Sequence, residues 1–584
     1  TKTSSDTKMS SNKLQVPPQA PPRFSDTQSS ILSKAMDLIE RSRKAKDELV
    51  AHVPLEDATF ANVLLPLAND ENLLAIEFEI LKFYQSVSTD PELRDASREA
   101  EKLFNEFVLE TETREDLYNL VKWVFDKSNI EELDPESRRL LEKKYKDYER
   151  NGLGLPESQR LRFKEIKKHL NQLRIDYQKN LNSQHGGIWL TLQELDGVSA
   201  DFISSLQKRK TDDNHLGKVW LSFKSSDIFM ALRYAKNEET RKKIFIADEN
   251  KCSQNADILK EAAVLRDEAA RLLGYSHHAS FRIEEKMAKN SETVEIFLDD
   301  LWSKLTTSGQ EELADQKQFK KADLESRGEP FNGFYLWDHA FYSCLMRQNE
   351  LSIDHKKIAE YFPLQTSVQG MLGIFQRLFG LIFKGMVVEK GSDIVWHDDV
   401  LVFSVWDDED LGSGFVGYLY MDLFSRDGKY PNPSDWNLQP GSIREDNTRH
   451  YPSTALLCQF PKPSPDIMDL DISSKYNSLR KAIRLTDGPE TLGQGDGWGH
   501  GEANIPHWMG TYDSGFYSYL WSEVYALDMF DTVFRSDPLN AKEGRKYRKL
   551  VLEKGDSQDC MKTLTDFLGR EPSREAFFKE LGLA

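Results

Sequence analysis

Apolar residues recur at steps of three and four along most of the chain, which is the pattern of helices that bury one face. This pattern predicts helices over residues 29–51, 71–107 and 137–150, and again from Ser474 to the end. The clearest predicted helix covers residues 157–182, directly after a Gly- and Pro-containing break. Its apolar residues form a seam: Phe163, Ile166, Leu170, Leu173 and Tyr177. The seam predicts packing against a neighbouring helix of the same chain, with a dimer zipper as the alternative.

Strand patterns are few and lie in the middle of the chain. Residues 401–406 and 415–424 are rich in β-branched and aromatic residues and are separated by a turn-forming run, so they predict a hairpin. Residues 454–460 predict a third strand. The longest apolar run, residues 371–388, contains Gln376, Arg377 and Lys384 and is too polar to span a membrane, so it predicts a buried helix followed by a strand. The expected fold class is mostly α with a small sheet.

Composition narrows the function classes. Hydrophobic residues make up 39% of the 584 residues, which favours a packed protein over a disordered one. The net charge of −19 makes nucleic acid an unfavourable partner. Four widely spaced cysteines without a CxxC pair indicate free thiols in a reducing compartment, so we expect a cytoplasmic location. No signal peptide is evident, and no membrane partner is expected.

Several catalytic motifs are absent from the sequence. There is no GxSxG, no P-loop and no dinucleotide fingerprint. None of the twelve histidines is followed by Glu, and no two histidines are four residues apart. The HExxH arrangement, which places two imidazoles and a glutamate base on one helix, therefore cannot form here.

The most specific stretch of the sequence is HWMGTYDSGFYSYLWSEVY, from His507 to Tyr525; others are GYLYMDLFSRDGKY from Gly417, QFPKPSPD from Gln459 and FLGREPSREAFFKELGL near the end. These stretches resemble the thimet oligopeptidase, neurolysin and saccharolysin family of zinc metallopeptidases. The resemblance runs in order from about residue 30 to the C-terminus. It implies a two-lobed helical body with a deep central channel that admits short peptides, a monomer, and zinc-dependent hydrolysis of internal peptide bonds. Residues 1–28 are rich in Ser, Thr, Lys, Gln and Pro, which predicts a disordered tail. The expected division of the rest is an N-terminal helical domain over 29–225 and a catalytic-type domain over 226–584.

One block of the family pattern is missing near residues 466–474. In the family, the stretch after QFPKPSPD leads into HExxH and then to a glutamate ligand. Here Asp466 runs within a few residues into Ser474, so on the order of a hundred residues that carry the zinc ligands and the base are absent. The resemblance therefore implies zinc as the cofactor, whereas this chain has no ligands for it.

The resemblance assigns roles in the aromatic segment. It implies that His507 and Tyr519 are catalytic, through hydrogen bonds to the oxyanion of the tetrahedral intermediate, and that Tyr512 and Gly510 bind substrate. Two positions depart from the family: Phe516 replaces a tyrosine, and Thr511 replaces a glycine. Without the family, the segment predicts a helix that starts between residues 510 and 514, with its aromatic residues in the core.

Three hypotheses follow from this combination. The chain is a true oligopeptidase whose sequence has been shortened, a catalytically inactive peptide-binding relative, or a hydrolase with an improvised metal site such as His500, Glu502 and His507. Phe516 favours the second hypothesis, because a splicing error does not explain it. The loss of a core segment favours the first, because it would leave apolar helix faces uncovered.

Overall fold

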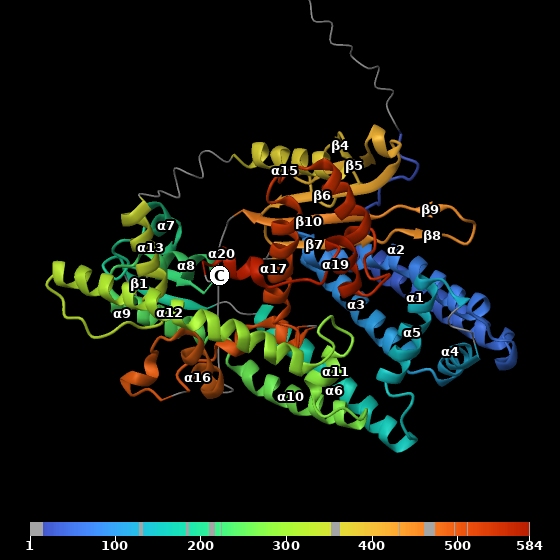
Figure 1. Cartoon of the computed structure of the whole chain (residues 1–584), viewed down its shortest axis with the longest axis horizontal. Helices are drawn as coiled ribbons and strands as arrows, with labels where there is room; N and C mark the ends of the chain where they lie inside the picture. Colours follow the sequence, from blue (N-terminus) through green and yellow to red (C-terminus); the bar gives the residue numbers. More distant parts are fainter. Residues whose placement is uncertain are drawn as a thin grey trace, which may run out of the picture. The chain divides into compact units, whose positions relative to one another are not determined.

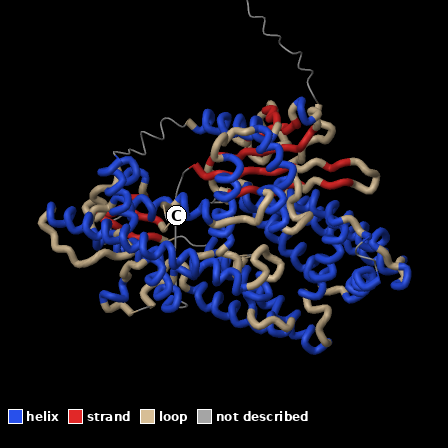
Figure 2. Tube along the Cα trace, in the orientation of Figure 1, coloured by secondary structure: helices blue, strands red, loops and turns tan. Residues whose placement is uncertain are grey.

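The described residues form two compact units, each assembled from separate stretches of the chain. The computed structural model describes residues 16–127, 132–182, 186–208, 217–223, 225–351, 363–430, 433–460, 473–495, 497–510 and 512–582. Unit 1 comprises residues 1–153, 368–462 and 537–558, and unit 2 comprises the remainder. Helices dominate and strands are few (Figure 2), so the predicted mostly-α class with a small sheet is confirmed. The predicted division into an N-terminal domain that ends at residue 225 and a catalytic-type domain that begins at residue 226 stays a prediction. The deep central channel also stays a prediction.

Unit 1 combines helices from the start of the chain with a sheet from its middle (Figure 1). Its helices are α1 (Gln28–His52), η1 (Leu55–Asp57), η2 (Phe60–Leu64), α2 (Leu65–Val87), α3 (Pro91–Glu112), α4 (Glu115–Lys127), α5 (Pro135–Arg150), α15 (Leu364–Phe379), which begins in unit 2, η4 (Glu409–Leu411), α18 (Ala541–Tyr547) and η9 (Arg548–Leu552). Its strands are β4 (Leu381–Gly385), β5 (Leu401–Asp407), β6 (Phe415–Phe424), β7 (Ser434–Gln439), β8 (Ser442–Ile443), β9 (Arg449–His450) and β10 (Ser453–Phe460).

The predicted helix over residues 71–107 is two helices, α2 and α3. The backbone of Ser88 is extended, and Asp90 caps α3 by accepting a hydrogen bond of 2.9 Å from the amide of Glu92. Pro91 occupies the first turn, where its missing N–H costs nothing. The apolar spacing on both sides masks this break, because capping depends on only a few residues.

The five-stranded sheet has the order β4-β5-β6-β10-β7. The predicted hairpin of β5 and β6 is confirmed as an antiparallel pair, and β10 joins β6 in parallel. Buried Lys429 follows β6. Its Nζ, with three N–H donors, lies 2.8 Å from each of four oxygens: Oδ1 and the carbonyl of Asp422, and the carbonyls of Phe424 and Cys458. One buried cation therefore joins β6 to the end of β10.

The described part of the predicted N-terminal tail packs on unit 1. Phe24 is buried against Trp396 and Tyr420, with ring centroids 4.9 and 6.0 Å away. The side chain of Gln19 pairs with the backbone of Tyr451, donating to its carbonyl at 2.9 Å and accepting from its amide at 2.8 Å. Disorder is therefore wrong for residues 16–27, because Phe24 completes an aromatic core. Residues 1–15 lie outside the described part.

The apolar run over residues 371–388 forms a helix and then a strand, as predicted, but the helix is not buried. Only Leu372 of α15 is buried, whereas Ile374 and Phe375 are exposed. The apolar pattern alone does not distinguish a covered helix from an uncovered one.

Unit 2 is also mainly helical. Its helices are α6 (Glu157–Asn182), α7 (Ala200–Ser205), α8 (Ser225–Tyr234), α9 (Glu238–Glu249), α10 (Gln254–Leu272), α11 (His278–Ile283), α12 (Ser291–Ser326), α13 (His339–Leu351), α16 (Ser473–Arg484), η5 (Pro489–Leu492), η6 (Gly501–Asn504), η7 (Pro506–Met509), α17 (Ser518–Met529), η8 (Phe530–Phe534), α19 (Cys560–Leu568) and α20 (Glu575–Glu580). Its strands are β1 (Gly187–Thr191), β2 (Gln207–Lys208) and β3 (Lys218–Ser222). This small sheet, outside the middle of the chain, was missed from sequence.

The predicted seam of α6 packs within the chain. Leu173 and Tyr177 lie against Leu259 and Ala262 of α10, and Phe163 and Ile166 lie against Ala269 of the same helix. The intramolecular alternative is therefore correct for this seam, and it forms the α6–α10 pair that supports the site described below.

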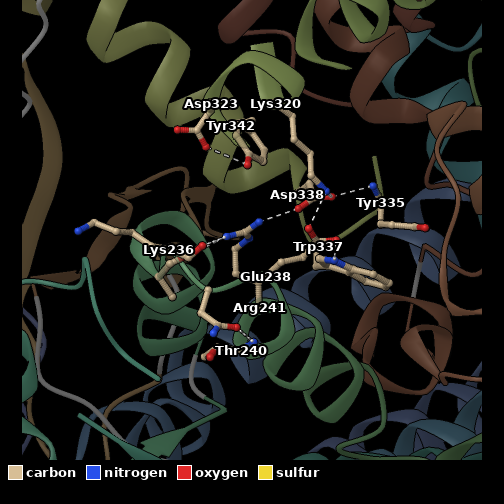
Figure 3. Close-up of polar contacts among 12 residues, drawn as sticks. Lys236, Glu238, Thr240, Arg241, Lys320, Asp323, Tyr335, Trp337, Asp338 and Tyr342 are labelled. Carbon is tan, nitrogen blue, oxygen red and sulfur yellow. Dashed lines mark hydrogen bonds and ion pairs between the residues drawn. The ribbon is translucent and has the colours of Figure 1, made fainter. Parts of the chain in front are cut away.

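A buried ion network joins α9, α12 and the residue before α13 (Figure 3). Oδ1 of Asp338 accepts from Nη2 of Arg241 at 2.7 Å, and Oδ2 accepts from Nζ of Lys320 at 2.7 Å and from the amide of Tyr335 at 2.9 Å. Lys320 Nζ also lies 2.9 Å from Glu238 Oε2. Arg241, Lys320 and Asp338 are essentially inaccessible to solvent. Because a buried charge is costly unless it is paired, these groups are held together as a unit.

Candidate functional site

Three aromatic side chains of the aromatic segment gather around His507 in unit 2. His507 lies in η7, residues 512–517 form turns, and α17 begins at Ser518. Tyr519 Oη lies 3.3 Å from His507 Nε2. The rings of Tyr512 and Phe516 contact the imidazole edge-to-face, with centroids 5.5 and 5.7 Å away. Tyr512 also stacks on Tyr519, with centroids 5.3 Å apart. We call His507, Tyr512, Phe516 and Tyr519 the aromatic cluster.

The aromatic cluster is accessible to solvent. Tyr519 is 51% exposed and Phe516 is 50% exposed. The opposite face of α17 supplies the core residues Trp521 and Val524, which are buried with Phe297 of α12. In the aromatic segment, therefore, only the side chains on one face of α17 are buried in the core, and those on the other face are exposed. The helix also starts later than expected, because residues 512–517 turn back toward η7 before it begins.

The chain before His507 is anchored on the α6–α10 pair. Tyr177 Oη donates to the carbonyls of Glu502 and Ile505, at 3.3 and 3.1 Å. Met509 is buried against Leu173 and Tyr177 of α6 and Leu259 of α10. Exposed His507 is thus carried by a short segment that is fixed on both sides.

Three basic residues from α10 and α11 surround Asp513. Its Oδ2 is 2.6 Å from His278 Nε2 and 3.6 Å from Arg266 Nε, and its Oδ1 accepts from Arg282 Nε at 3.0 Å. Arg266 also donates from Nη1 to the carbonyl of Trp508 at 2.7 Å. These contacts fix the residue after His507 and the residue after Tyr512.

The electrostatics of Asp513 follow from this geometry. Burial alone would raise its pKa, but the hydrogen bond from His278 and the charges of Arg282 and Arg266 outweigh burial and lower the pKa to about 2. Burial lowers the pKa of Arg266. The ordinary pKa of an arginine side chain is so high, however, that Arg266 remains charged. At neutral pH Asp513 is therefore ionised, and it holds the site through its contacts with the charged side chains of Arg266 and Arg282.

The residues of the improvised metal site do not come together as a metal-binding group. His500 Nδ1 lies 3.7 Å from Glu502 Oε1, and both side chains are almost fully buried, whereas His507 is exposed. In the described ranges, no three or more His, Cys, Asp and Glu residues form a group that could hold a metal ion. The donor set that zinc requires is therefore not met by the described residues.

Gly510 is exposed, and its position does not require glycine. A Cβ added there would lie 3.7 Å from its nearest neighbour, the carbonyl oxygen of His507, which is an ordinary contact. Its role in substrate binding stays a prediction, as do the roles of His507, Tyr512 and Tyr519. Thr511 lies outside the described residues.

Sequence reasoning missed Arg266, His278 and Arg282. Each lies more than two hundred residues before the aromatic segment, where basic residues in helical patterns normally face solvent. One signal was available: Asp513 is an acidic residue in a segment, residues 506–525, that contains no Lys or Arg. A carboxylate packed among aromatic residues needs cationic partners, and these had to come from elsewhere in the chain.

Comparison with known proteins assigns this chain to the class of oligopeptidases. The sequence profile described as "Neurolysin/Thimet oligopeptidase, N-terminal domain" matches residues 36–160. The profile described as "Peptidase family M3" matches residues 231–471 and 465–583. The chain belongs to peptidase family M3.

Named relatives match nearly the whole chain. Saccharolysin from Saccharomyces cerevisiae is 32% identical over 97% of this chain and 95% of its own length. A thimet-like oligopeptidase from Dictyostelium discoideum is 27% identical over 94% of this chain and 97% of its own. Oligopeptidase A from Escherichia coli is 23% identical over 90% and 93%, respectively. Among the described residues, no helix has both the length and the apolar character needed to cross a membrane.

Proposed function

We propose that this chain binds short peptides at the aromatic cluster and does not hydrolyse them. The observation that carries the proposal is the exposed pair of Tyr519 and His507, whose polar atoms lie 3.3 Å apart beside the stacked ring of Tyr512. Exposed aromatic rings with polar tips supply both apolar contact area and hydrogen bonds to a peptide backbone. The names of the oligopeptidase relatives support peptides as the ligand class.

The loss of hydrolysis is proposed from the missing metal ligands. The sequence contains no His-Glu pair. The alignment with saccharolysin spans 688 positions although the chain has 584 residues, so more than a hundred positions have no residue in this chain. The two matches to the family profile meet at residues 465–471, where the zinc-binding block is expected. In zinc peptidases the metal-activated water is the nucleophile, so a chain without the zinc ligands lacks that nucleophile.

A second candidate function is an active zinc oligopeptidase whose sequence is shortened here. The helix after the junction, α16, favours it, because Leu479 and Ile483 lie one turn apart and are 54% and 59% exposed. An absent segment would bury such an apolar ridge. The genomic DNA between the codons for Asp466 and Lys475 decides the matter: an in-frame intron that encodes HExxH establishes the shortened enzyme.

We further propose that the protein is a cytosolic monomer. The four cysteines lie far apart in the sequence and form no CxxC pair, which supports a reducing compartment. Subcellular fractionation tests the location, and light scattering coupled to size-exclusion chromatography tests the mass. A membrane-bound fraction, or a mass twice that of the chain, would contradict the respective proposal.

Peptide binding and cleavage can be tested with one ligand. A nonapeptide with fluorescein at one end is titrated by anisotropy, and its quenched version is incubated with the same protein. We expect saturable binding without cleavage, and weakening of about tenfold in Tyr519→Phe and His507→Phe, since each removes one hydrogen-bonding group. Tyr430→Phe, in unit 1, is the control and should bind as the wild type does. Equal affinity in all variants, or chelator-sensitive cleavage, would refute the proposal.

A further inference from the structure

The carbonyl of Trp508 and the carboxylate of Asp513 are held by the same guanidinium. Arg266 Nη1 donates to Trp508 at 2.7 Å, and its Nε lies 3.6 Å from Asp513 Oδ2. Trp508 directly follows His507, and Asp513 directly follows Tyr512. One side chain of α10 therefore contacts both the residue after His507 and the residue after Tyr512.

The bridge is built into a protected site. The Arg266 side chain is 15% exposed and that of Asp513 is 5% exposed, so water competes weakly for these contacts. Arginine carries its donors on separate nitrogens of a rigid plane, so Nη1 faces Trp508 while Nε faces Asp513, whereas lysine has only one nitrogen with which to reach both partners. Because α10 is packed along α6, the fork starts from a fixed helix rather than from a loop.

We propose that Arg266 is a positioning residue, which sets the distance between the imidazole of His507 and the ring of Tyr512 by clamping their neighbours Trp508 and Asp513. It does not touch the bound peptide. The alternative is that Arg266 is only a counter-charge for buried Asp513. Arg282 provides the comparison, because its Nε donates to the same carboxylate at 3.0 Å, whereas the contact with the carbonyl of Trp508 comes from Arg266.

Two measurements distinguish a clamp from a counter-charge. The first is the position of the His507 imidazole signal in a 13C-histidine NMR spectrum, assigned by its loss in His507→Gln. This signal senses the rings of Tyr512, Phe516 and Tyr519, which lie within 6.3 Å of the imidazole, centroid to centroid. The second is the affinity for the fluorescein-labelled nonapeptide used above. Only the second measurement rests on the proposed peptide binding.

In Arg266→Gln we expect the His507 signal to shift and the peptide to bind about tenfold more weakly. Arg266→Lys keeps the charge but cannot span both partners, so it should shift the same signal. Arg282→Gln should leave the signal closer to its wild-type position, because the Trp508 contact is intact.

Several results would overturn the clamp. A His507 signal at the wild-type position in both Arg266 variants would do so, as would equal shifts in Arg282→Gln and Arg266→Gln. If Arg266→Gln does not fold, Arg266→Lys carries the test alone, and an unshifted signal there overturns the clamp. If the wild type does not bind the nonapeptide, the proposed function fails, whereas the NMR shift still tests the clamp.

Discussion

The hydroxyl of Tyr519 lies 3.3 Å from Nε2 of His507, although twelve residues separate them in sequence. The turns over residues 512–517 bring the first residues of α17 back to η7 and produce this approach. In either tautomer of the imidazole, one of the two groups donates to the other. The pair therefore remains hydrogen-bonded without ligand and is oriented before a peptide arrives.

The first prediction concerns the metal. We expect the purified chain to hold no stoichiometric zinc after dialysis, because no HExxH is present and no group of metal-binding side chains is found in the described ranges. Elemental analysis by mass spectrometry measures it. A variant that carries the absent block from an M3 relative is the control and should hold one zinc. One tightly held zinc in the unaltered chain would contradict the prediction.

The second prediction concerns the ion network of unit 2. Asp338→Asn leaves buried Arg241 and Lys320 with less negative charge, so we expect the free energy of unfolding to fall by about 3 kcal/mol. Urea unfolding followed by circular dichroism measures it. Glu325→Gln is the matched control, since it removes an exposed carboxylate from a neighbouring ion pair of α12 and should change stability by less than about 0.5 kcal/mol. Equal losses in the two variants would show that the network does not stabilise the unit.

Part of the fold and part of the candidate site could be predicted from the sequence. The seam of α6 was predictable, because apolar spacing reports directly on a buried helix face. The aromatic cluster was identified from the resemblance, residue by residue. Its exposure was not predictable from the pattern, because Tyr519 and Trp521 look alike in sequence although they lie on opposite faces of α17.

Long-range polar contacts were the part that sequence could not supply. Two of the three basic partners of Asp513 lie 231 and 235 positions earlier, at Arg282 and His278, and no local rule connects them to it. The burial of Arg241 and Lys320 was likewise invisible, because both residues belong to a type that is normally exposed. The break between α2 and α3 was missed for a smaller reason: the capping signal of Asp90 and Pro91 was outweighed by the apolar spacing on both sides.

The third prediction concerns acid stability. The pKa of Asp513 is lowered to about 2, below the ordinary value of about 3.9 expected in the unfolded chain. The depressed pKa adds stability that is present above pH 4 and is lost as the pH falls toward 2. From about pH 5 to about pH 3 this residue should account for a loss of about 1 kcal/mol.

Asp513→Asn isolates that contribution, because its side chain does not titrate. Urea unfolding at both pH values should show a smaller pH dependence in the variant than in the wild type, by about 1 kcal/mol. Glu325→Gln again serves as the control and should retain the wild-type dependence. If Asp513→Asn and the wild type lose stability equally, the cations around Asp513 do not depress its pKa as described.

The fourth prediction concerns Phe516, the residue of the aromatic cluster that departs from the family pattern. Its ring contacts His507 edge-to-face, with centroids 5.7 Å apart, and is 50% exposed, so a hydroxyl added to it can reach a ligand. In a chain with the absent block restored, Phe516→Tyr adds a hydrogen-bond donor for the developing oxyanion. Removal of one such donor costs about a hundredfold in rate in other enzymes. We therefore expect kcat to rise strongly with little change in KM, because the bond forms mainly in the transition state.

Tyr519→Phe in the same restored chain is the matched control, because it removes a hydroxyl from the neighbouring ring, 5.3 Å away. It should lower kcat while leaving the fold intact, since Tyr519 is half-exposed. Steady-state kinetics on a quenched peptide measure both variants. If Tyr519→Phe abolishes turnover and Phe516→Tyr has no effect, Phe516 is a neutral variation, and the shortened-enzyme explanation gains over the inactive relative. If neither variant changes kcat, the aromatic cluster does not contact the reacting bond, and the roles assigned to His507 and Tyr519 are wrong.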